Sequence, residues 1–172
     1  EEQTGIRVRI LSGYEEAYNG FLGVVNSTTL RDGYLLDIGG GSLELMRVER
    51  RSLAEVTSAP LGAIYSRERY LRSDPATPKE LRALRKAVHQ HFGTPPPNPV
   101  LYGSGGAVRN LARIIRMQRG YPLRRLHGLE ISRRELHRLA SRLAAVSTDE
   151  RRRIPGVGSN RADILHAAAV VI

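Results

Sequence analysis

The chain has 172 residues, of which 41% are hydrophobic, and this length and composition favour a single globular domain with a real core. It contains no cysteine, which excludes disulfides, thiolate metal sites and cysteine nucleophiles and is compatible with a reducing cytosol. No apolar run approaches the roughly 20 residues of a membrane span, and the first residues do not resemble a signal peptide. We therefore expect a cytoplasmic protein without a membrane partner.

The chain is strongly basic, with a formal net charge of +10, and all of its 27 basic residues except Lys79 and Lys86 are arginine. Because the planar guanidinium group matches phosphate oxygens, this bias favours a polyanionic ligand. Nucleic acid is the first alternative, but only 5% of the residues are aromatic and they are not interleaved with basic residues. Arginine runs such as Arg151–Arg153 are expected on solvated faces, and we assign no site to them.

The N-terminal part of the chain predicts a short strand and then a helix. Apolar residues alternate over Ile6–Leu11, which is typical of a strand. Ser12 and Glu15 have the spacing of a capping box and predict the start of a helix. The apolar residues of that helix recur at core spacing: Ala17, Phe21, Leu22 and Val25.

Glu16 has no capping role, and the face of the helix on which it lies continues through Gly20 and Gly23. Glycines leave this face bare, so the Glu16 carboxylate can closely approach a substrate or another element. The alternative is an ordinary surface carboxylate.

The stretch from Tyr34 to Glu44, YLLDIGGGSLE, predicts two strands joined by a glycine turn. If Gly40 and Gly41 are the central residues of a tight hairpin, Asp37 lies opposite Glu44. Directly opposed residues share a face of the sheet, with their Cβ atoms about 5 Å apart. Two carboxylates held this closely repel each other unless a cation lies between them.

Oxygen ligands without nearby cysteine or histidine suit Mg²⁺ or another hard divalent cation, so Asp37 and Glu44 are candidate metal ligands. In the turn, Gly39, Gly40 and Gly41 allow backbone N–H groups to point at an anion, and the Ser42 hydroxyl adds a donor. The alternative is a flexible hairpin whose Asp37 faces solvent.

The next segments predict an alternation of strands and helices. In chain order we expect an antiparallel strand at Leu53–Ser58, a helix at Ala63–Leu71, a helix from Thr77 to Phe92 and a short buried strand at Val100–Tyr102. A second glycine loop containing Gly105 and Gly106 then leads into a helix at Ala107–Met117. A strand, a glycine loop and a helix together often bind phosphate at the helix N-terminus, although a tight turn for close packing explains the pattern equally well.

Serine residues mark the expected starts of the last helices. Ser132 and Ser147 are each followed three residues later by glutamate, as in a capping box. Ser159 is expected to cap the final helix, which carries Arg161 and ends in the apolar run Ile164–Ile172. Because the chain stops within this run, we expect it to have been trimmed from a longer sequence.

Several ordered segments together resemble the exopolyphosphatase/guanosine pentaphosphate phosphohydrolase (Ppx/GppA) family: ILSGYEEA, LLDIGGGSLEL, APLGAI, YGSGGAVRNLA, LHGLEISRREL and DERRRIPGVGSNRADIL. The resemblance implies an α/β fold of the ribonuclease H-like, actin-like ATPase superfamily, with a mixed sheet, an antiparallel hairpin core and packed helices. It further implies that residues 1–172 are a single domain, the second lobe of a two-lobed catalytic module. By the same resemblance, we expect a first lobe that completes the cleft to be missing from this chain.

The implied activity is Mg²⁺-dependent hydrolysis of a terminal phosphoanhydride of inorganic polyphosphate or of pppGpp. Glu16 resembles the family glutamate that orients or deprotonates the attacking water, and Asp37 and Glu44 resemble its metal and water carboxylates. Residues 39–42 resemble its second phosphate loop, while Arg161 resembles an arginine that faces the phosphate cleft.

The sequence departs from the family pattern at three positions. Tyr18 replaces an arginine, and Leu43 and Ala107 each replace a threonine. These departures support an alternative, a non-catalytic sensor that binds polyphosphate or guanosine polyphosphates. A second alternative is an ATP-dependent relative of the sugar-kinase type. An exposed lobe interface would also favour self-association of this chain as a homodimer.

Overall fold

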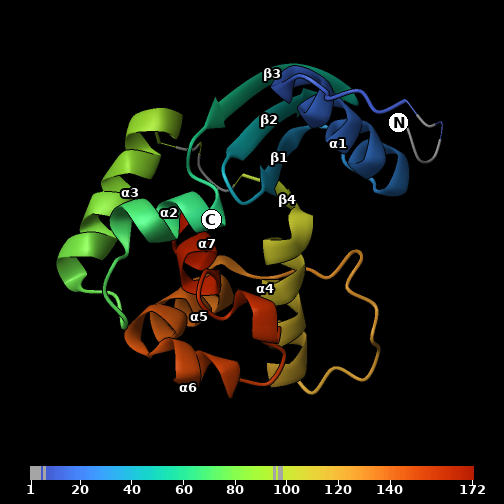
Figure 1. Cartoon of the computed structure of the whole chain (residues 1–172). Coiled ribbons are helices and arrows are strands. Elements are labelled where there is room, and N and C mark those ends of the chain that lie inside the picture. The colour runs from blue at the N-terminus through green and yellow to red at the C-terminus, as the bar shows by residue number, and fades with distance from the viewer. Residues whose placement is uncertain (1–4, 6, 95, 97–98) are drawn as a thin grey trace.

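The computed structural model describes residues 5, 7–94, 96 and 99–172. Within these residues, four strands form one mixed sheet in the order β3-β2-β1-β4 (Figure 1). The three antiparallel strands follow one another along the chain: β1 (Gly33–Ile38), β2 (Leu43–Glu49) and β3 (Ser52–Ala59). The fourth strand, β4 (Leu101–Ser104), runs parallel to β1 at the other edge.

Helices account for most of the remaining described residues. Their bounds are α1 (Gly13–Ser27), α2 (Ala63–Tyr70), α3 (Pro78–Phe92), α4 (Gly105–Gln118), α5 (Arg133–Ala145), α6 (Thr148–Arg152), the 3₁₀ helix η1 (Ser159–Arg161) and α7 (Leu165–Val171). Capping boxes begin four of them, with a serine or threonine N-cap and a glutamate three residues on, as the sequence predicts. No helix among the described residues is both long and apolar enough to cross a membrane.

The sheet separates two layers of helix, and alternate strand residues supply the two cores. Leu35 faces α1, where it packs with Phe21 and Val25. Its neighbour Leu36 faces the opposite layer, which is built largely from α2, α3, α4 and α7. A further cluster joins α4, α5 and α7 below the sheet. The expected mixed sheet with an antiparallel hairpin and packed helices is therefore confirmed.

Three expectations about individual elements were wrong. Residue 6 lies outside the described part of the chain, and residues 7–11 form no strand; Val8 and Ile10 are 82% and 93% exposed. Alternation alone is insufficient, because a strand needs a hydrogen-bonding partner. The strand expected at Val100–Tyr102 does form, as β4, but its expected burial is wrong, because β4 is an edge strand and its Leu101 is 42% exposed. Ser159 does not cap the last helix: it begins η1, and α7 has Ile164 at its N-cap.

Arg151 was also wrongly placed on a solvated face. Its side chain is fully buried and donates to the carbonyl oxygens of Leu143, Val146 and Ala162 at 2.6–2.8 Å. It also pairs with Asp74 at 2.5 Å. The guanidinium thus ties the segment that follows α5 to the end of η1.

Candidate functional site

A row of polar side chains crosses all four strands at one end of the sheet. Asp37, at the end of β1, lies opposite Glu44 on β2 and beside Ser104 on β4. Glu44 in turn lies opposite Ser58 on β3, whose hydroxyl donates to Glu44 Oε1 at 3.1 Å. The predicted pairing of Asp37 with Glu44 is confirmed. The two serines were not predicted as part of the row.

Helix α1 passes over this row with its glycine face. An added Cβ atom at Gly20 would lie 3.7 Å from Asp37 Oδ2, so the backbone of α1 closely approaches the carboxylate. Glu16 lies one helical turn before Gly20, on the same face, and is exposed. The predicted bare face therefore brings α1 against Asp37 and leaves the Glu16 carboxylate accessible at the same edge.

The glycine turn is held by the start of α2. The carbonyl oxygens of Gly39, Gly40 and Gly41 accept hydrogen bonds of 2.9–3.1 Å from the amides of residues 62–65. Gly62 makes this contact possible, because a Cβ atom there would lie 2.5 Å from the carbonyl carbon and oxygen of Gly40. The turn is therefore fixed on its carbonyl side, unlike the flexible hairpin of the alternative interpretation.

The amide side of the turn is open. Among the described residues, no acceptor is found for the backbone N–H groups of Gly40, Gly41 and Ser42, while Gly39 N–H donates to the Ser42 carbonyl at 3.0 Å. Successive unpaired amides form an anion-binding concavity. The turn can therefore accept an anion beside Asp37 and Glu44.

The second glycine loop lies next to the same aspartate. Gly105 has φ +89°, and an added Cβ atom would lie 2.7 Å from Asp37 Oδ1. Gly106 is equally close to Arg161, because its added Cβ atom would lie 2.5 Å from Arg161 Nη2. The fold thus brings Gly105, Gly106 and Arg161 together at the start of α4, close to Asp37.

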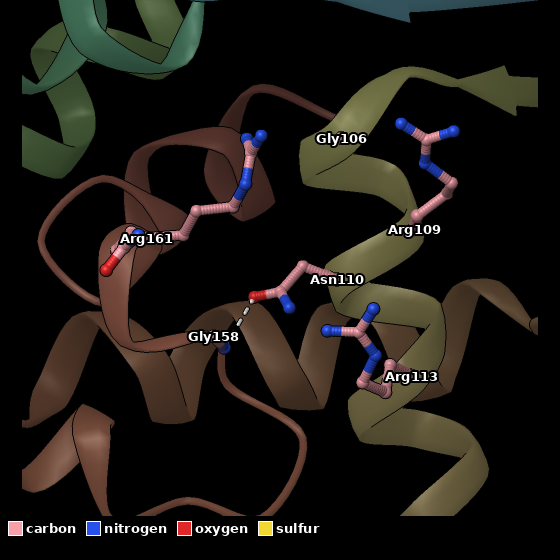
Figure 2. Close-up of a pocket in the computed structure, with 7 residues that line it drawn as sticks. Gly106, Arg109, Asn110, Arg113, Gly158 and Arg161 are labelled. Carbon is pink, nitrogen blue, oxygen red and sulfur yellow. Dashed lines mark hydrogen bonds between the residues drawn. The ribbon is translucent and has the colours of Figure 1, made fainter.

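The N-terminus of α4 carries no side-chain cap. Ser104 makes no capping hydrogen bond and donates instead to the Leu36 carbonyl at 3.5 Å, and the first turn of α4 has no acidic residue. The first amides of a helix are partially positive, yet the Arg161 guanidinium lies against them (Figure 2). An anion at this point would stabilise both positive groups.

A pocket of about 370 Å³ opens beside this helix start. Its lining residues are Gly106, Arg109, Asn110, Arg113, Gly158, Asn160 and Arg161. The prediction included Gly106 and Arg161 but missed Arg109, Asn110 and Arg113. Their spacing on one helical face is visible in the sequence, but the turn that brings Gly158 opposite them is not.

Asp37 and Glu44 suit a cation that takes only some of its ligands from the protein. No group of three acidic, histidine or cysteine side chains in the described part of the chain could hold a metal ion. Mg²⁺ commonly uses one or two carboxylates and completes its shell with water and substrate phosphates. Asp37 and Glu44 fit this second type of site.

Two of the three departures from the family pattern lie in the core. Leu43 and Ala107 are 2% and 3% exposed and belong to the same apolar cluster. Tyr18 is 41% exposed and stacks on Tyr14 with ring centroids 6.3 Å apart. Of the three positions, Tyr18 is therefore the one whose side chain is open to solvent.

The mixed sheet, its antiparallel hairpin and its packed helices define an α/β fold that the chain shares with solved Ppx/GppA proteins. The structure resembles the crystal structure of the Aquifex aeolicus Ppx/GppA family member, with a TM-score of 0.84 at 22% identity, over 99% of this chain and 56% of that one. It also resembles an exopolyphosphatase from Cytophaga hutchinsonii, with a TM-score of 0.79 at 24% identity, over 98% of this chain and 57% of that one.

The chain belongs to the Ppx/GppA phosphatase family, whose sequence model matches residues 1–172. It is 35% identical to an uncharacterized protein of Streptomyces coelicolor, over 99% of this chain and 54% of that protein. It is 25% identical to exopolyphosphatase 2 of Mycobacterium tuberculosis, over 98% of this chain and 55% of that protein. The chain therefore spans about half the length of these relatives.

Proposed function

We propose that this chain is the second lobe of a phosphoanhydride hydrolase that removes terminal phosphate from inorganic polyphosphate or pppGpp. One observation carries the proposal: Asp37 and Glu44 are opposed beside the unpaired amides of the glycine turn. Carboxylates next to anion-binding amides suit a reaction in which a cation and hydrogen-bond donors stabilise phosphoryl oxygens. The relative named exopolyphosphatase 2 supports the same class of substrate.

Each group of residues in the proposed site has its own role in such a reaction. The amides of Gly40, Gly41 and Ser42 hold the oxygens of the phosphate that is cleaved. Asp37 and Glu44 hold Mg²⁺, which neutralises charge on the phosphates when bound. Glu16, exposed at the edge of the glycine face of α1, orients or deprotonates the attacking water.

The proposed site forms only one side of an active-site cleft. The chain covers about half of its relatives, and Asp37 and Glu44 lie partly exposed at one end of the sheet. We infer that a first lobe of the same parent protein closes the cleft, and that the isolated chain binds phosphate and Mg²⁺ without turnover.

The test is phosphate release from long-chain polyphosphate, pppGpp and ATP with Mg²⁺. This chain is compared with the longer protein that carries both lobes. We expect release by the longer protein alone, and its loss on Glu16→Gln. If Glu16→Gln left phosphate release unchanged, the role assigned to Glu16 would be wrong. A preference for ATP would indicate a kinase-like relative.

The non-catalytic sensor is the second candidate, and Tyr18 favours it. An aromatic side chain at an exposed position of α1, two residues after Glu16, replaces the arginine of the family pattern. Mg²⁺-dependent binding without release by the two-lobed protein would support the sensor. Restored release on Tyr18→Arg would then identify this position as the cause.

A further inference from the structure

The pocket beside α4 is a basic groove that extends beyond the proposed cleavage site. Arg161 marks its near end, against Gly106 and close to the loop that contacts Asp37. Arg109 and Arg113 line its continuation along α4. Because they are one helical turn apart, their positions differ by about 6 Å along the helix axis. The groove thus presents arginines in sequence, leading away from Asp37.

These three arginines carry uncompensated charge. No side-chain hydrogen bond or ion pair is found for Arg109, Arg113 or Arg161 among the described residues, and none of the lining residues is acidic. Other arginines are paired: Arg119 with Glu135 at 2.8 Å and Arg151 with Asp74 at 2.5 Å. Three unpaired guanidinium groups around one pocket favour a ligand that carries several negative charges.

Hydrogen bonds of Asn110 hold the part of the groove between the arginines in place. Asn110 is 3% exposed, and its side-chain amide donates to the Gly156 carbonyl at 3.1 Å. Its oxygen accepts from the Gly158 amide at 3.4 Å (Figure 2). These bonds fasten the turn that precedes Arg161 to the middle of α4. The groove is therefore preformed, which reduces the entropic cost of binding.

The lining also limits what the ligand can be. Every lining residue is glycine, asparagine or arginine, so the groove has no aromatic ring or aliphatic side chain for a nucleobase to pack on. Stacking of a nucleobase usually uses such surfaces, whereas contacts to phosphate do not. A continuous chain of phosphates needs none of them, because every unit presents oxygens to a guanidinium group.

We propose that Arg109 and Arg113 bind the phosphates that follow the cleaved unit, and that this groove makes the protein select long inorganic polyphosphate over pppGpp. The inference rests on the proposed function and deepens it, because it chooses between the two substrates. Arg161 binds the part of the polyphosphate that lies nearest Asp37. The two arginines of α4 bind the phosphate units that follow.

The test is calorimetric titration of the chain with long-chain polyphosphate and with tripolyphosphate in the presence of Mg²⁺. The variant is Arg109→Ala/Arg113→Ala, in which both positions are exposed and the fold should be retained. The control is Arg138→Ala/Arg142→Ala on α5, which has the same spacing and the same loss of charge but does not line the groove.

We expect the groove variant to bind long-chain polyphosphate about 10- to 100-fold more weakly, as the loss of one to two charge-assisted contacts implies. Its affinity for tripolyphosphate should change by less than about threefold, because a short ligand does not need the far end of the groove. An equal loss in the control variant, or equal losses for both ligands, would overturn the proposal. The proposal would also fail if duplex DNA displaced polyphosphate from the protein and the affinity for DNA depended in the same way on Arg109 and Arg113.

Steady-state kinetics of the two-lobed protein separate this inference from the proposed function. A groove variant that raises the KM for long-chain polyphosphate but not for pppGpp supports the inference. Unchanged KM values with phosphate release retained would overturn the inference and leave the proposed function intact. If the two-lobed protein releases no phosphate while the calorimetric difference persists, the proposed function fails and the groove remains a polyphosphate site.

Discussion

Asp37 lies directly against the backbone of Gly105, so closely that a Cβ atom at residue 105 would come within 2.7 Å of Asp37 Oδ1. The same atom would lie 3.0 Å from the carbonyl oxygen of Ile38. The glycine therefore serves two purposes: it adopts φ +89°, and it leaves space for a carboxylate of the proposed site.

We predict that Gly105→Ala displaces the Asp37 carboxylate. Phosphate release by the two-lobed protein should fall about 100-fold, because displacements near 1 Å cost that much in a positioned reaction. The measurement is kcat on polyphosphate. Gly120→Ala is the matched control, since Gly120 also has a positive φ of +62° but has no atom within 4 Å of its added Cβ atom. It should lose stability and keep activity; an equal loss of kcat in both variants would contradict the steric explanation.

The contact between Gly62 and the glycine turn predicts a loss of stability. In Gly62→Ala the new methyl group would meet backbone atoms of Gly40 and Gly41 at 2.5 Å, and backbone cannot move aside as a side chain can. We expect the free energy of unfolding to fall by about 1–3 kcal/mol, as is usual for overpacking. Urea denaturation measures it. The helical control Gly23→Ala has open space and should instead gain up to about 1 kcal/mol.

His166 predicts a pH dependence of stability near neutrality. Its ring is buried on α7, and neither ring nitrogen has a partner among the described residues. Burial, assisted by the positive charges of Arg151 and Arg67, lowers the pKa of His166 from 6.5 to about 3. The folded state therefore keeps the ring neutral, while the unfolded chain takes up a proton as the pH falls below 6.5.

Stability should thus be highest above pH 6.5 and decline as the pH falls towards 3, by up to about 1.4 kcal/mol per pH unit. The measurement is urea denaturation between about pH 7 and 5, a window in which carboxylates contribute little. His166→Leu should remove the slope, and by removing unpaired polar atoms it should not destabilise the protein at neutral pH. A slope that persists in the variant would refute this assignment.

Arg151 is expected to be essential for stability. Arg151→Met would leave Asp74 Oδ1 and the carbonyls of Leu143, Val146 and Ala162 without their Arg151 donor, while Asp74 Oδ2 keeps the Thr148 amide. Breaking a buried pair in this way costs about 3–5 kcal/mol. Asp74→Asn should cost less, because the asparagine oxygen can still accept from Arg151 and Arg151 keeps its three carbonyl acceptors. Chemical denaturation compares the two; a variant Arg151→Met as stable as the parent would show that the buried pair contributes no net stability.

The elements predicted most accurately were those determined by neighbouring residues. Capping boxes join groups three residues apart, so Ser12 and Glu15 could be paired from the sequence alone. The two-residue turn at Gly40 and Gly41 determined the register of the hairpin, and with it the pairing of Asp37 with Glu44. The predicted strand was wrong over residues 7–11, because no local pattern supplies a partner strand.

The sequence by itself indicated the family through its ordered motifs, and it determined the hairpin and the pairing of Asp37 with Glu44 because these join residues close along the chain. Only the tertiary structure decided which distant groups join them. Ser104 lies 67 residues from Asp37 and pairs beside it, and Arg161 reaches the start of α4 from 55 residues away. The buried Arg151 and the unpaired Arg109 have the same side chain, and only packing decides that one stabilises the fold while the other remains available to a ligand.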